Sequence, residues 1–107
     1  MGLFNRFKNR KIIKSNLDQG ELFRQDKQYD KALECYNNVL ELDPNNSKVL
    51  YKKGWILSEL KRDEEALKCY GAFLKFRPKD EDGWLGKTNS LKNLNILTLI
   101  STYENSC

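Results

Sequence analysis

The sequence predicts an all-α protein in which antiparallel helix pairs stack as a short solenoid. Three observations lead to this fold class. A set of residues recurs at a spacing of 34 positions, apolar residues follow the period of an amphipathic helix, and the segments between the predicted helices are short. The chain has 107 residues, of which 39% are apolar and 32% are charged, a composition that favours a folded helical protein over a disordered one.

The internal repeat is the strongest of these observations. Seven residues of the first half recur 34 positions later, and they include Gly, Pro, Cys and Tyr, so coincidence is improbable. The recurring pairs are Gly20 and Gly54, Ala32 and Ala66, Leu33 and Leu67, Cys35 and Cys69, Tyr36 and Tyr70, Leu40 and Leu74, and Pro44 and Pro78.

Each repeat predicts two helices. The second helices, over 30–42 and 63–76, carry apolar residues at i, i+1, i+4, i+7 and i+8, which form one continuous stripe. The first helices are expected at 14–26 and 47–60. Because the connections are only two or three residues long, the two helices of each pair must be antiparallel neighbours.

Prolines and capping residues predict where these helices end and begin. Pro44 and Pro78 disfavour helical backbone at the preceding residue and donate no hydrogen bond, so a helix should end before each of them. Asn46 or Ser47 can then cap the following helix, and Asp80 the one after Pro78.

Two glycines stand in the middle of predicted helices. Gly20 and Gly54 each cost about 1 kcal/mol relative to Ala at such a position. That cost is tolerated where two helices must approach closely. Ala32 and Ala66 are the small residues expected across the contact.

These residues resemble the 34-residue unit of tetratricopeptide repeat proteins, W-x₂-L-G-x₂-Y…A-x₃-F…P. The resemblance covers about residues 13–93 and implies a right-handed α-solenoid. Asn16, Gln19 and Lys53 depart from the family's apolar residues. The matching residues are Gly20, Phe23, Ala32, Tyr36 and Pro44 in the first unit, and Leu50, Gly54, Leu57, Ala66, Tyr70 and Pro78 in the second.

The third unit begins like the others and then loses the pattern. Trp84 occupies the family's aromatic position, whereas Thr88 replaces the glycine. A short capping helix is expected after Asn95.

We therefore divide the chain into a basic segment over 1–12 and a repeat array over 13–107, with repeats at 13–46 and 47–80 and a degenerate third repeat or capping helix at 81–107.

The N-terminal segment is basic and amphipathic. The first fifteen residues of the chain hold five Lys or Arg and no acid, while the rest of the chain is nearly neutral. One interpretation is a solubilising tail, and another is contact with an anionic membrane surface. The residues expected to make that contact are Leu3, Phe4, Arg6, Phe7 and Lys8.

Composition also narrows the function classes. The chain has no His, and the spacing of its three Cys matches no zinc motif, so we expect no metal site, cofactor or catalytic residue. The net charge of +4 comes from the N-terminal segment, which argues against a nucleic-acid partner. Isolated thiols favour a cytoplasmic location.

The resemblance implies a protein-interaction adaptor that binds a peptide or helix in the concave groove formed by the first helix of each repeat. Tyr51 and Trp55 lie four residues apart, with two Lys beside them, and aromatic and cationic residues are common anchors in interfaces. The residues expected to line the groove are Lys48, Tyr51, Lys52, Trp55, Leu17, Glu21, Leu85 and Asn89.

Two alternatives remain open at this stage. The N-terminal segment can dock on a membrane surface, alone or in addition to groove binding. The poorly capped, apolar C-terminal end can instead self-associate, or indicate a truncated or frame-altered member of a longer array.

Overall fold

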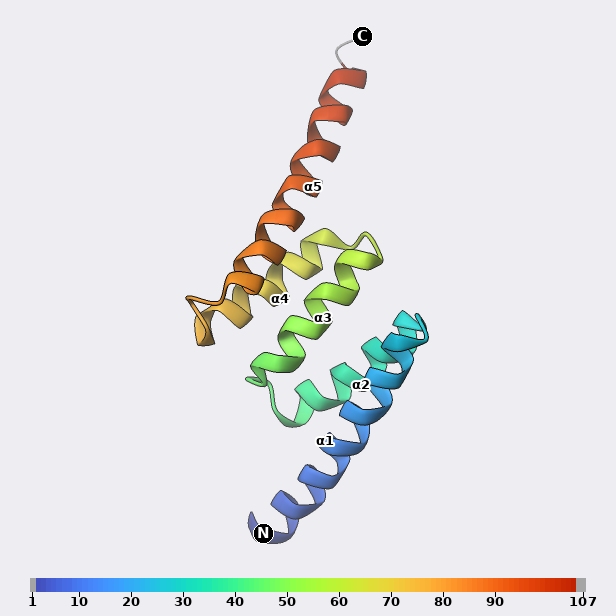
Figure 1. Ribbon diagram of the computed structural model, residues 1–107, viewed down its shortest axis with the longest axis vertical. Helices are drawn as coiled ribbons and strands as arrows, with labels where there is room; N and C mark the ends of the chain where they lie inside the picture. The colour runs from blue at the N-terminus through green and yellow to red at the C-terminus, as the bar shows by residue number, and fades with distance from the viewer. Residues whose placement is uncertain (1, 106–107) are drawn as a thin grey trace. The chain divides into compact units, whose positions relative to one another are not determined.

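The computed structural model shows an all-helical chain (Figure 1) and describes residues 2–105, with side chains described over 8–95. The described helices are α1 (Gly2–Gln25), α2 (Tyr29–Leu42), α3 (Ser47–Glu59), α4 (Asp63–Phe76) and α5 (Glu81–Asn105). The predicted fold class is confirmed: α1 with α2, and α3 with α4, form antiparallel pairs. The chain divides into two compact units, Met1–Val49 and Leu50–Cys107, so the boundary falls in the first turn of α3.

The turn inside each pair has the same geometry in both repeats. Lys27 and Lys61, which are 34 residues apart, have φ angles of 59° and 64°. The next amide then donates to a carbonyl of the last helical turn: Gln28 N–H to Phe23 O at 2.8 Å, and Arg62 N–H to Leu57 O at 2.8 Å. These bonds satisfy carbonyls that a helix end otherwise leaves unpaired.

The predicted caps are also confirmed. Asn46, rather than Ser47, caps α3, because its Oδ1 accepts the Val49 N–H at 3.1 Å. Asp80 caps α5 through its Oδ1, which accepts the Gly83 N–H at 3.1 Å. Such side-chain acceptors satisfy amides at the start of a helix.

A tyrosine ring lies against the mid-helix glycine in each repeat. A Cβ added to Gly20 would lie 2.7 Å from the Tyr36 ring, and one added to Gly54 would lie 3.1 Å from the Tyr70 ring. Ala32 and Ala66, the residues expected across these glycines, are both fully buried, and the atoms nearest to each glycine belong to the tyrosine ring.

The two ends of the described chain differ from expectation. Helix α1 begins at Gly2 rather than at Lys14, so no break separates residues 2–12 from the first repeat helix. The side chains of Leu3, Phe4, Arg6 and Phe7 lie outside those described, and their membrane contact stays a prediction; Lys8 is exposed.

Helix α5 also continues through Asn95 without a turn, so the separate capping helix is wrong. The β-branched residues of its last part lower helix propensity but leave every backbone donor free to bond within the helix.

The glycine contacts predict a graded response to alanine. Gly71 lies mid-helix in α4 with nothing described within 4 Å of an added Cβ, so Gly71→Ala should raise the free energy of unfolding by up to about 1 kcal/mol. Gly20→Ala should lower it by about 1 kcal/mol, because overpacking against the buried Tyr36 ring outweighs the helix-propensity gain. Gly54→Ala should fall between the two. Urea unfolding of the three variants tests this order, and equal effects would contradict it.

Candidate functional site

The second unit contains a pocket of about 500 Å³ between α3 and α5. The residues that line the pocket are spaced at i and i+4 on α3 and at i, i+4 and i+7 on α5. Each helix therefore turns one face toward the pocket. The residues that line it include Tyr51, Trp55, Ser58, Leu85, Asn89 and Lys92.

Close approach of α5 to α4 depends on Gly86. A Cβ added at this position would lie 2.5 Å from the Tyr70 ring, a distance at which the ring would have to move. The same ring contacts Gly54 on α3, so Tyr70 lies between a glycine of each neighbouring helix. Tyr70 is almost fully buried and forms the inner wall of the pocket.

Tyr51 is half-buried and packs on two other rings. Its ring centroid lies 5.8 Å from that of Tyr70 and 5.3 Å from that of Phe73. Burial, followed by the charges of Asp82 and Asp80, raises the pKa of Tyr51. Tyr51 is therefore as much a core residue as an anchor for a partner, and its truncation would disturb packing.

Hydroxyl groups join the helices below the pocket. The Oγ atoms of Ser58 and Ser90 lie 3.2 Å apart, and Ser90 is fully buried. Burial raises the pKa of Tyr70 to about 12, partly offset by a hydrogen bond to Ser58. The Tyr70 phenol is thus neutral and hydrogen-bonded at physiological pH.

The charges around the pocket balance. Lys61 and Lys92 contribute two cations, and Glu59 and Asp82 contribute two carboxylates. The pocket itself therefore carries no net charge that would select an acidic or a basic ligand.

The structure brings together only part of the predicted groove. Tyr51, Trp55, Leu85 and Asn89 all line the pocket. Lys48 and Lys52 lie on α3 near its start and are not among the lining residues.

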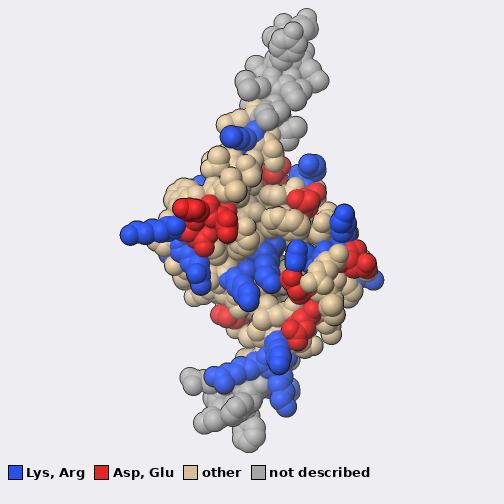
Figure 2. All heavy atoms as spheres, in the orientation of Figure 1, with Lys and Arg blue, Asp and Glu red and all other residues tan. Residues whose placement is uncertain are grey.

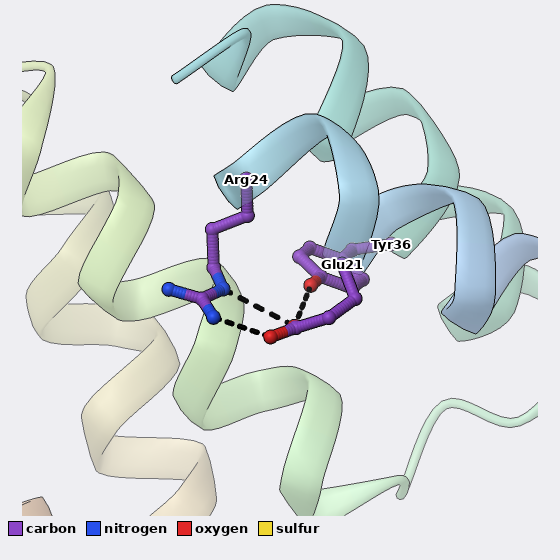
Figure 3. A network of polar contacts seen from close by, with 3 residues as sticks. All are labelled: Glu21, Arg24 and Tyr36. Carbon is purple, nitrogen blue, oxygen red and sulfur yellow. Dashed lines mark hydrogen bonds and ion pairs between the residues drawn. The ribbon is translucent and has the colours of Figure 1, made fainter. Parts of the chain in front are cut away.

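The other two predicted groove residues, Leu17 and Glu21, belong to α1 in the first unit. Glu21 is held by its neighbours there: its carboxylate pairs with the Arg24 guanidinium, with Nε 3.1 Å from Oε2, and accepts the Tyr36 hydroxyl at 3.2 Å (Figure 3). The hydrogen bond with Glu21 raises the pKa of Arg24, and burial together with the Glu21 charge raises the pKa of Tyr36 to about 12.

Several pocket residues were missed by sequence reasoning. Lys61, Asp82 and Asn93 line the pocket, and the i, i+4 spacing of Asp82 from Gly86 and of Asn93 from Asn89 on α5 was available as a signal. The Asn93 Nδ2 also donates to Oδ1 of the buried Asp63 at 3.2 Å. This hydrogen bond joins residues 30 positions apart, and no sequence pattern predicts it.

The described part of the chain shows no cluster of three or more Cys, Asp or Glu arranged to hold a metal ion. Cys35 and Cys69 are buried free thiols, and burial raises the pKa of both. Both are therefore protonated packing residues at neutral pH.

Among the described residues, no helix has the length and apolar character needed to span a membrane.

Comparison with known proteins gives two family matches. The model described as "TPR repeat" matches residues 20–61, and the model described as "Tetratricopeptide repeat" matches residues 47–80. Together they cover residues 20–80, which include both mid-helix glycines and both tyrosines that pack on them.

Curated relatives share part of their length with this chain. A Drosophila melanogaster protein named BBSome complex member BBS4 homolog is 31% identical over 99 residues, covering 76% of this chain and 20% of the relative. The human N-alpha-acetyltransferase 16, NatA auxiliary subunit, is 33% identical over 67 residues, covering 63% of this chain and 8% of the relative. The chain thus spans a fifth or less of each of these proteins.

Solved structures of the protein MamA share the fold. One superposes with a TM-score of 0.74 at 25% identity, covering 78% of this chain and 45% of the MamA chain. A second MamA structure gives a TM-score of 0.73 at 24% identity and covers 81% of this chain.

The two buried tyrosines predict a loss of stability in alkali. Tyr36 and Tyr70 keep their protons to about pH 12 in the folded state, whereas an unfolded tyrosine loses its proton near pH 10. The stabilisation is complete below pH 10 and is lost as pH rises to 12, by roughly 2–3 kcal/mol for each tyrosine. Urea unfolding between pH 9 and 12 should show this fall, and the Tyr36→Phe, Tyr70→Phe double variant should show less of it. If the free energy of unfolding depended on pH identically in both proteins, that result would be evidence against the raised pKa values of Tyr36 and Tyr70.

Proposed function

Because this chain belongs to the tetratricopeptide repeat family, whose domains typically serve as protein-interaction modules, we propose that its second unit binds a segment of a partner protein. The binding site in this proposal is the pocket between α3 and α5. The partner contributes an apolar side chain to the pocket and polar backbone or side-chain groups to its rim.

One observation carries the proposal: aromatic, aliphatic and amide side chains from two helices converge on a single pocket. Trp55 is half-buried and Leu85 is exposed, so both have surface available for a partner to cover. Asn89 can donate and accept hydrogen bonds beside them. Exposed apolar surface next to hydrogen-bonding groups is the usual composition of a peptide-binding site.

The size and charge of the pocket define the segment that it can take. A volume of about 500 Å³ holds one or two large side chains and not a folded domain. The balanced charges at the rim leave the apolar contact as the main source of affinity.

The proposal includes no catalytic step. The chain lacks His, and no residue of the pocket is paired as a nucleophile with a base. The names of the relatives support a role in assemblies: one is an auxiliary subunit of an acetyltransferase complex and another is a member of a multiprotein complex.

Peptide selection tests the site. Random twelve-residue peptides displayed on phage should yield binders with a large apolar residue, and Trp55→Ala should raise their dissociation constant at least tenfold, because about 1.4 kcal/mol of contact is lost. Isothermal titration calorimetry measures this change. Leu85→Ser should have a smaller effect in the same direction.

Phe76→Ala is the matched control, because Phe76 is a half-exposed aromatic at the end of α4 that does not line the pocket. Its affinity should equal that of the unaltered protein. To probe Tyr51 in the same assay, Tyr51→Phe is a better variant than Tyr51→Ala, because the ring packs in the core and its removal would disturb folding. Selected peptides that bind Trp55→Ala and the unaltered protein equally would disprove the site.

A further inference from the structure

Helix α5 carries an uncovered apolar stripe that is separate from the pocket. Trp84 is 47% exposed and Leu91 is 41% exposed, although both are large and apolar. Thr88 and Asn95 are exposed as well. The four residues follow one another at spacings of 4, 3 and 4, so they form one line along the helix.

The internal repeat relates this line of residues on α5 to a buried face of α3. Positions 84, 88 and 91 correspond to Leu50, Gly54 and Leu57, each 34 residues earlier on α3. Leu50 is 8% exposed, Leu57 is 1% exposed, and Gly54 lies against the Tyr70 ring of α4. The stripe on α5 is therefore the face that a second helix covers in the preceding repeat.

Thr88 restricts which helix can cover α5. In the two complete repeats the corresponding position is glycine, and an added Cβ would lie 2.7 or 3.1 Å from the tyrosine ring of the covering helix. Threonine adds a β-branched side chain at that point. A covering helix with an aromatic ring in the place of Tyr36 or Tyr70 is therefore disfavoured, and a small side chain fits best opposite Thr88.

A second copy of α5 meets this requirement. When two α5 helices run antiparallel and cross beside Thr88, the small Thr88 side chains face one another. Trp84 of one copy then faces Leu91 of the other, because these residues lie four positions before and three positions after Thr88. The arrangement is two-fold symmetric, so each contact occurs twice.

Charges on one flank of the stripe favour the same orientation. Glu81 and Lys92 are exposed and lie on the same flank, about three helical turns apart. In an antiparallel pair that flank meets its own counterpart, which places Glu81 of each copy near Lys92 of the other. A parallel pair would leave these opposite charges far apart.

Trp84 is already positioned for such a contact. Its Nε1 donates to the Pro78 carbonyl at 2.6 Å, which fixes the indole, and the Lys87 ammonium lies 5.0 Å from the ring centroid. An immobilised indole loses little side-chain entropy when a partner covers it.

We propose that two copies of this chain associate through antiparallel pairing of their α5 helices, with Trp84 of each copy against Leu91 of the other and Thr88 at the crossing point. Leu85 and Asn89 mark the pocket side of α5 and Lys92 lies at its edge next to the stripe, so pairing leaves Leu85 and Asn89 uncovered. The proposal does not depend on peptide binding.

Sedimentation equilibrium of the full chain tests the pairing. The unaltered protein should show a reversible monomer–dimer equilibrium, and Leu91→Glu should raise the dissociation constant at least tenfold, since a carboxylate would be buried against Trp84. Leu85→Glu is the matched control, an exposed leucine of the same helix on the pocket side, and should leave the dissociation constant unchanged. Circular dichroism confirms that both variants are folded.

A charge exchange tests the orientation. Glu81→Lys alone and Lys92→Glu alone should each weaken the dimer, and the double variant should restore it. Monomeric sedimentation at several hundred micromolar would overturn the proposal. So would a dimer that Leu85→Glu dissociates and Leu91→Glu does not, because that result would place the interface in the pocket. Single charge changes that the double variant fails to rescue would overturn the antiparallel orientation.

Discussion

Each complete repeat depends on one contact, a tyrosine ring packed on a glycine in the middle of the neighbouring helix. Tyr36 lies on Gly20 and Tyr70 on Gly54, so the same contact recurs 34 residues apart. The glycines are unfavourable for helix formation, and the structure retains them because a ring occupies the space of the missing side chain. Since Tyr70 also contacts Gly86, this contact positions α5 as well and therefore shapes the pocket between α3 and α5.

The same two tyrosines connect packing to the polar network. The Tyr36 hydroxyl donates to Glu21, which is paired with Arg24, and Tyr70 is hydrogen-bonded with Ser58, which contacts the buried Ser90. On the face drawn in Figure 2, Lys and Arg are interspersed with Asp and Glu, with a cationic group beside the undescribed residues of the N-terminal end. Recognition in our proposals relies on the apolar pocket and on the α5 stripe.

The fold was accessible from the sequence because its determinants are local and repeated. Helix periodicity, Pro44 and Pro78, and the capping residues Asn46 and Asp80 act within a few residues of where they stand. The tyrosine ring packed on each glycine was not predicted, because spacing along the chain does not reveal which residue of a stripe reaches furthest across. The pocket was partly predicted: Tyr51, Trp55, Leu85 and Asn89 converge, whereas Glu21 is engaged in its own unit and Asn93, which also lines the pocket, was missed. The unbroken α5 was missed because β-branched residues lower helix propensity without preventing a helix.

A double-mutant cycle between Gly20 and Tyr36 tests the central contact most directly. Gly20→Ala is measured by urea unfolding in the unaltered protein and in the Tyr36→Leu background, where the smaller side chain leaves room for a methyl group. We predict that the substitution destabilises the unaltered protein and stabilises the Tyr36→Leu protein, so that the two effects differ by more than about 1 kcal/mol. The same free-energy change in both backgrounds would show that the ring and the glycine are not coupled and would contradict this account.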